Sequence, residues 1–235
     1  MKFYRQLLTL SFVTFPTASG FLQKPQEREN QFQMKMSLKP AAVSLMDSGK
    51  ALARSGELLI DLTSSLNLYG GALSAAGAQI RNSGDCVAQA AASCRFKTAA
   101  ELVCDELREG ATCLLGATDK LKLAVDEAYT DDDPRLAAVM ERMVDTLGKA
   151  GNDLEAAGAC IMIRDPVSEV GVKLGSCGRD LEEISKQLLD LAPEQVESIE
   201  CSQRMAYAAQ QMVEAANELK GEKKPTPTGK GWLKQ

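Results

Sequence analysis

The chain has 235 residues and a formal net charge of −5, and it contains no histidine. This length allows one large or two small domains with a buried core. The acidic balance lacks the basic footprint of a nucleic-acid-binding protein, and the missing histidine removes the commonest general base and the usual ligand of zinc and haem iron. No P-loop, dinucleotide-binding glycine motif or CxxC pair is present. The sequence therefore predicts no catalytic residue, no cofactor, no metal site and no nucleic-acid partner.

The first twenty residues have the three parts of a secretory signal peptide. Two basic residues open the chain, the apolar run 7–15 follows, and the small residues Ala18 and Gly20 form a cleavage site directly before Phe21. The apolar run is too short to span a bilayer, and no later stretch reaches the roughly eighteen apolar residues that a membrane helix needs. We therefore expect cleavage after Gly20 and no transmembrane segment.

The junction Ala18-Ser19-Gly20-Phe21 resembles the ASA-F junction in the bipartite plastid presequences of diatoms and related algae with complex red plastids. In such presequences a signal peptide is cut before an aromatic residue, and the next segment acts as a transit peptide. The resemblance implies that residues 1–20 are the signal peptide, that residues 21–36 are the transit peptide, and that Phe21 is a targeting residue. It places the protein in the plastid stroma, with an ordinary secreted protein as the alternative.

Residues 45–94 hold one heptad register with a large aliphatic residue at the first core position and mostly a small residue at the second. The first position is occupied by Leu45, Leu52, Leu59, Leu66, Leu73, Ile80, Val87 and Cys94. The second is occupied by Ser48, Ser55, Leu62, Tyr69, Ala76, Ser83 and Ala90. The pattern returns at 107–124, 140–161, 167–191 and 201–219. It predicts an all-α, elongated antiparallel bundle of five or six long helices over residues 37–220.

Glycine stands directly after the small core position in many of these heptads. The positions are Gly49, Gly56, Gly70, Gly77, Gly84, Gly151, Gly158, Gly171 and Gly178. A glycine inside an exposed helix costs about 1 kcal/mol relative to alanine, so the set would cost roughly as much as the net stability of a whole domain. The glycines nevertheless recur at one heptad position. This indicates close approach of neighbouring helices there, where a side chain would clash.

Prolines and capping residues mark the expected helix boundaries. Prolines at helix starts are Pro40, Pro134, Pro166 and Pro193, with Asp133 and Asp165 as N-caps and Thr98 with Glu101 as a capping box. They predict helices near 41–95, 98–129, 134–163, 166–192 and 193–220. The first would be about 80 Å long at 1.5 Å per residue. A break at 67–71 is the alternative, which gives six helices of similar length.

The segment 221–235 is rich in lysine, proline, threonine and glycine, which predicts a disordered basic tail. It contains Trp232, the only tryptophan of the chain. With Leu233, this residue forms a candidate docking motif for a protein partner, because an aromatic side chain is a common anchor in interfaces. The alternative is a solvated tail.

The seven cysteines have no metal-ligand spacing. If two antiparallel helices meet near residue 97, Cys86 faces Cys113 and Cys94 faces Cys104, each pair offset by roughly 7 Å along the helix axis. Disulfides require Cα atoms within about 7 Å of each other. Both disulfides are therefore candidates, and buried thiols that act as small core residues are the alternative.

Together these features predict a non-enzymatic interaction or scaffold protein of the plastid, such as an assembly factor or a peripheral subunit of a larger complex. The partner is expected to be a protein. One alternative is an amphipathic helical protein that associates with lipid or a membrane surface. The acidic body and the scarcity of aromatic residues speak against that alternative. A secreted helical protein is the other alternative.

Overall fold

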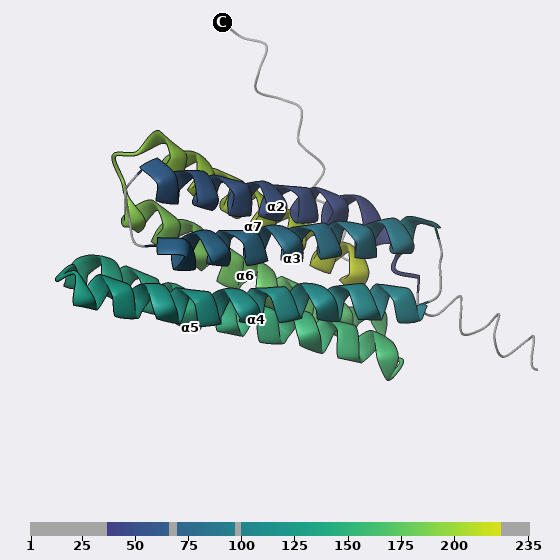
Figure 1. Cartoon of the computed structure of the whole chain (residues 1–235). Coiled ribbons are helices and arrows are strands. Elements are labelled where there is room, and N and C mark those ends of the chain that lie inside the picture. Colours follow the sequence, from purple (N-terminus) through teal and green to yellow (C-terminus); the bar gives the residue numbers. More distant parts are fainter. Residues whose placement is uncertain (1–36, 66–69, 97–99, 222–235) are drawn as a thin grey trace, which may run out of the picture. The chain divides into compact units, whose positions relative to one another are not determined.

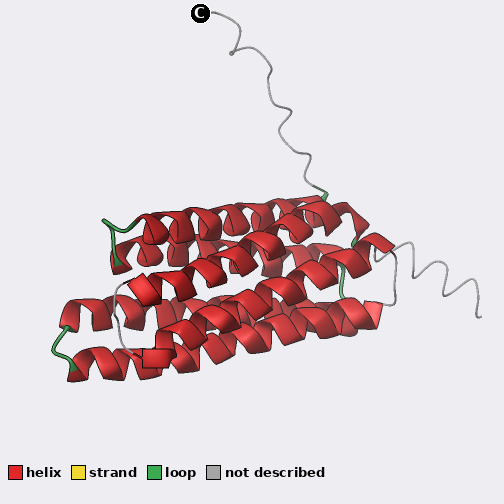
Figure 2. Ribbon diagram, turned by 45° about the horizontal axis from the view of Figure 1, so that its top comes forward, coloured by secondary structure: helices red, strands yellow, loops and turns green. Residues whose placement is uncertain are grey.

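The computed structural model describes residues 37–65, 70–96 and 100–221. These ranges form one short 3-10 helix and six α-helices, and they contain no strand (Figures 1 and 2). The elements are η1 (Lys39–Ala41), α2 (Ala42–Ser65), α3 (Gly70–Phe96), α4 (Ala100–Thr130), α5 (Pro134–Met162), α6 (Val167–Leu191) and α7 (Val196–Lys220). The predicted all-α bundle is thereby confirmed. The predicted signal peptide and transit peptide, and residues 222–235 of the predicted tail, lie outside the described residues.

The α-helices form antiparallel hairpins, and the hairpins are arranged in a closed ring. Each helix packs against the next one along the chain in the opposite direction, and α7 also packs against α2 (Figure 1). The described helices therefore form a ring of three hairpins, α2–α3, α4–α5 and α6–α7. They contain 24 to 31 residues each, which corresponds to about 36 to 46 Å.

The predicted heptad register is the one that faces the core. Every described residue at its first position between 45 and 94 is at most 6% exposed, and Ser48, Ser55, Ala76, Ser83 and Ala90 at the second position are buried as well. Alanine, leucine and methionine fill most of the remaining interior, and the described core cluster contains no aromatic side chain. The apolar seam thus encloses one continuous core.

Glycines bring the backbones of α2 and α3 into direct contact. A Cβ added to Gly49 would lie 2.5 Å from the backbone nitrogen of Ala88, and one added to Gly84 would lie 2.5 Å from the carbonyl oxygen of Gly49. Gly56 and Gly77 meet in the same way one heptad further along, where a Cβ on Gly77 would lie 2.8 Å from the oxygen of Gly56. Since even a methyl group has no room at these positions, the predicted close approach of helices is confirmed.

In each of the other two hairpins, one helix supplies a pair of glycines that contact its partner helix closely: Gly151 and Gly158 in α5, and Gly171 and Gly178 in α6. In α5, a Cβ on Gly158 would lie 2.8 Å from Cγ of Arg108 and 3.1 Å from the carbonyl oxygen of Cys104 in α4. In α6, a Cβ on Gly171 would lie 2.7 Å from the carbonyl oxygen of Ala216 in α7. Two glycines seven residues apart therefore mark the inside of every hairpin.

The long expected helix 41–95 is two helices, because α2 ends at Ser65 and α3 begins at Gly70. The heptad register continues unchanged on both sides of residues 66–69. The heptad register could not distinguish one long helix from two. In both cases the same heptad positions face the core, whether the chain continues straight or turns back between α2 and α3. The six-helix alternative is confirmed.

The predicted start of α6 near 166 is correct to within one residue, but two details are wrong: Asp165 is not its N-cap, and Pro193 does not begin α7. Asp165 closes α5 instead of capping α6: Arg164 takes a left-handed φ of 64°, and the amide of Asp165 donates to the carbonyl of Cys160 at 2.9 Å, which is a Schellman-type helix end. Pro166 therefore occupies the N-cap of α6. Pro193 lies in a turn before α7, since the amide of Gln195 donates to the carbonyl of Ala192 at 3.0 Å.

The predicted start of α5 is confirmed in detail. Pro134 is its first residue, and the side chain of Asp133 accepts a hydrogen bond of 3.0 Å from the amide of Leu136. This carboxylate satisfies one of the free amides of the first helical turn. Thr98, the first residue of the predicted capping box for α4, lies outside the described residues.

Candidate functional site

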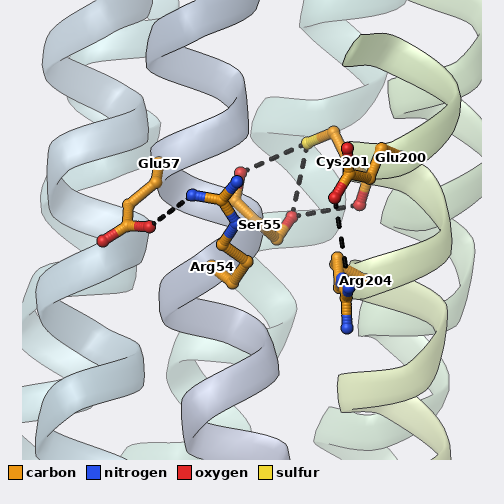
Figure 3. A network of polar contacts seen from close by, with 6 residues as sticks. All are labelled: Arg54, Ser55, Glu57, Glu200, Cys201 and Arg204. Atoms are coloured by element: carbon orange, nitrogen blue, oxygen red, sulfur yellow. Dashed lines mark hydrogen bonds and ion pairs between the residues drawn. The ribbon is translucent and has the colours of Figure 1, made fainter. Parts of the chain in front are cut away.

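The seam between α2 and α7 differs from the glycine seams inside the hairpins. Ser48 donates to the carbonyl of Ala208 at 2.8 Å, and Ser55 donates to the carbonyl of Cys201 at 3.3 Å. The thiol of Cys201 donates in return to the carbonyl of Ser55 at 3.3 Å (Figure 3). All three side chains are almost fully buried. The ring is thus closed by polar side chains that join segments about 150 residues apart in sequence.

Charged residues border this seam on its outer side. Arg54 in α2 forms an ion pair with Glu57 at 2.8 Å, and Glu200 in α7 pairs more loosely with Arg204 at 4.0 Å (Figure 3). The hydrogen bond to Glu57, and to a smaller extent the charge of Glu200, raise the pKa of Arg54. Because these side chains are exposed, the pairs add little to stability. These ion pairs matter here because they form a charged border on the surface beside the seam.

Next to this border, α7 carries a stripe of apolar side chains on its outer face. We define the α7 stripe as Val196, Ile199 and Tyr207, whose exposed fractions are 72%, 38% and 44%. At 100° per residue the stripe lies opposite the buried residues Cys201 and Met205. It lines an open hollow of about 500 Å³. The described residues around the hollow are Val196, Ile199, Glu200, Gln203, Arg204 and Tyr207.

Sequence reasoning missed the α7 stripe because it followed a single register. That register assigns α7 its core residues, such as Cys201 and Met212, and treats the opposite face as solvated. The spacing of Val196, Ile199 and Tyr207 by three and eight residues was the available signal, because it repeats an amphipathic pattern at a second helical phase. A search for two apolar phases on one helix would have found it.

The predicted cysteine pairs have different geometries in the structure, where all seven cysteines are free thiols. Cys86 and Cys113 are half-buried and face each other across α3 and α4, within hydrogen-bonding reach. Cys94 and Cys104 are buried, and the charges that act on them come from Glu106 in one case and from Asp105 and Arg108 in the other, not from the second thiol. The disulfides themselves stay predictions, and the buried-thiol alternative describes the other five cysteines.

Burial controls the ionisation of these thiols. It raises the pKa of Cys94 to about 12 and that of Cys201 to about 11, and it raises the pKa of Cys177 as well. A thiol in an apolar interior keeps its proton because the thiolate would lose its hydration. These side chains are therefore neutral core residues near neutral pH.

The remaining predicted site residues, Phe21, Trp232 and Leu233, lie outside the described residues. In the described part of the chain, no group of three or more Cys, Asp or Glu side chains lies close enough together to hold a metal ion. None of the described helices has an apolar stretch long enough to cross a bilayer. No known protein family, curated protein or solved structure matches the chain.

Proposed function

We propose that this protein is a non-enzymatic interaction protein that binds a helix of a protein partner on the α7 stripe. The observation that carries the proposal is the line of exposed apolar side chains at Val196, Ile199 and Tyr207. A helix that is already packed on its inner face has no structural need for a second apolar phase. Exposed apolar side chains that line a hollow at helical spacing are typical of helix-binding surfaces.

The stripe defines the chemistry of the partner segment. Its three residues extend over about 16 Å of helix, or three turns, so a partner helix of similar length can cover it. Such a helix needs apolar residues at spacings of three and four on one face. Glu200 and Arg204 border the stripe on the side of α2, so opposite charges at the matching flank of the partner helix would fix its direction.

Affinity purification from the native cell with matched variants tests the proposal. Ile199→Asp places a charge in the stripe and should abolish co-purification of the partner. Leu123→Asp, at an exposed apolar residue on α4 outside the stripe, is the control and should retain it. Both variants should keep the helix content and melting temperature of the wild type, because both positions are at least 38% exposed. If Ile199→Asp retained every partner that the control retains, the α7 stripe would not be the binding surface.

We place this activity in the plastid stroma, as an assembly factor or peripheral subunit, because of the resemblance at Ala18-Ser19-Gly20-Phe21. A fluorescent fusion of residues 1–36 should enter the plastid, and Phe21→Ala should retain it in the secretory pathway. Secretion of both fusions would favour the alternative of a secreted helical protein. This test concerns the location only and is independent of the α7 stripe.

The predicted tail supplies a second proposed contact through Trp232 and Leu233. Its lysines oppose the acidic balance of the body, so tail and bundle would present different surfaces to the partner. Deletion of residues 222–235 should leave the melting temperature nearly unchanged, because exposed terminal segments bury little. The deletion should weaken co-purification of the partner. Undiminished co-purification would remove the docking role of Trp232.

Association with a lipid surface is the competing use of the same apolar stripe. Interfacial membrane helices are usually rich in lysine and arginine, whereas this chain has a net charge of −5. We therefore expect the purified protein to stay at the bottom of a liposome flotation gradient made with anionic vesicles. Flotation that is lost in Ile199→Asp would assign the stripe to lipid instead of a partner helix.

A further inference from the structure

Two half-exposed thiols meet at the seam between the first and second hairpins. Cys86 in α3 and Cys113 in α4 are only partly buried, whereas the other cysteines are buried. Cβ of Cys86 lies 3.4 Å from the point that a Cβ on Gly110 would occupy. Cys113 follows Gly110 by three residues, so it lies on the same face of α4 about one turn further on. The two thiols are therefore neighbours and accessible to a small reagent.

The two helices pack closely beside these cysteines. A disulfide requires its two Cα atoms to lie within about 7 Å of each other, closer than many helix pairs allow. Gly110 contributes no side chain to the seam, and the carbonyl oxygen of Ser83 in α3 lies 3.4 Å from the position of its missing Cβ. This distance and that to Cβ of Cys86 are ordinary van der Waals contacts, so α3 and α4 pack directly against each other beside the two cysteines.

We propose that Cys86 and Cys113 form a reversible disulfide that ties α3 to α4. A small-molecule disulfide is the oxidant. The thiolate of one cysteine attacks it and forms a mixed disulfide, releasing one small thiolate. The second cysteine then attacks the protein-bound sulfur and releases the second one. In total, two cysteine thiols are oxidised, one small disulfide is reduced to two small thiols, and the two cysteine protons pass to those products.

The surroundings make this exchange slow at neutral pH. Burial, then the neighbouring Cys113, and the carboxylates of Glu109, Glu106 and Asp85 raise the pKa of Cys86 to about 12. Burial and Glu109 also raise the pKa of Cys113. Since only the thiolate attacks a disulfide, the reaction should accelerate about tenfold for each pH unit between pH 7 and 9. Acceleration with pH separates this pair from a low-pKa reactive cysteine, which would react at a constant rate there.

The test uses the purified full chain and oxidised glutathione. The oxidised protein should lose two hydrogens in mass without retaining glutathione, and peptide mapping should join Cys86 to Cys113. Dithiothreitol should reverse both changes. Cys113→Ser should instead retain one glutathione on Cys86, whereas Cys160→Ser, at a buried cysteine, should still form the link. The proposal is independent of the proposed partner, because no binding is measured.

Several outcomes would overturn it. Wild-type protein that retained glutathione on both cysteines without forming the link would show that the thiols cannot reach each other. A link from Cys94 to Cys104, or a link that survives in Cys113→Ser, would assign the oxidation to other residues. Mapping of the wild type decides the question even if a variant fails to fold.

Discussion

Gly84→Ala is the sharpest test of how the first hairpin is held together. The added Cβ would lie 2.5 Å from the carbonyl oxygen of Gly49, about 1 Å short of ordinary contact at 3.4 Å or more. The atoms that the new methyl group would meet belong to the backbone of α2, so no side chain can move aside to make room. The helices α2 and α3 must therefore separate. Overpacking of this kind costs about 1–3 kcal/mol. It exceeds the gain of up to about 1 kcal/mol from helix propensity, and we expect a net loss of about 1–2 kcal/mol.

Gly148→Ala is the matched control for this substitution. Gly148 also lies inside a helix, but an added Cβ would meet only Cγ2 of Thr118, at 3.9 Å. The propensity gain should then appear alone, as a stabilisation of about 0.5–1 kcal/mol. Urea unfolding measures both free energies if the m-values stay unchanged. Equal stabilisation by both substitutions would refute the backbone contact between α2 and α3. The double variant Gly49→Ala, Gly84→Ala should cost less than the sum of its parts, because one separation accommodates both methyl groups.

Three further predictions concern the polar and thiol groups. Burial raises the pKa of Cys201 to about 11 in the folded state, against an ordinary 9.0. Stability should therefore fall as the pH rises from 9 to 11, and in Cys201→Ala the fall measured by urea unfolding should be shallower by about 1 kcal/mol per pH unit. A disulfide between Cys86 and Cys113 should raise the unfolding free energy by about 3–4 kcal/mol, measured against the reduced protein. Ser48→Ala should cost about 0.5–1.5 kcal/mol, whereas Thr112→Ala, which removes an exposed hydrogen bond, should stay within about 0.5 kcal/mol.

The core could be predicted from the sequence because it depends on one local rule. A residue such as Leu59 is followed every seven residues by another that faces the same side of its helix. Glycine that recurs at one helical phase indicates close approach of a neighbouring helix. Both signals are read along the chain without knowledge of which helices are neighbours. The buried register and the glycine contacts of α2 with α3 therefore agree with the structure.

The missed features depend on relations that a local pattern does not contain. The role of Asp165 is set by the left-handed conformation at Arg164, because the same Asp–Pro pair can end one helix or begin the next. The pairing of Ser55 with Cys201 requires knowledge that α7 lies against α2. The α7 stripe is visible as spacing, but only the packed bundle shows that Tyr207 stays exposed after folding.

The position of the stripe on α7 links the proposed binding to the closure of the ring. Inside each hairpin, glycines join helices that are neighbours in sequence, so these contacts can form locally. The α2–α7 seam joins the two ends of the bundle through Ser48 and Ser55, and it closes the ring of three hairpins. A helix bound to Val196, Ile199 and Tyr207 would lie on the outer face of the closing helix. If such a helix binds only the folded bundle, it would stabilise the folded state by RT ln(1 + [L]/Kd), or about 2.7 kcal/mol at a hundredfold excess over Kd.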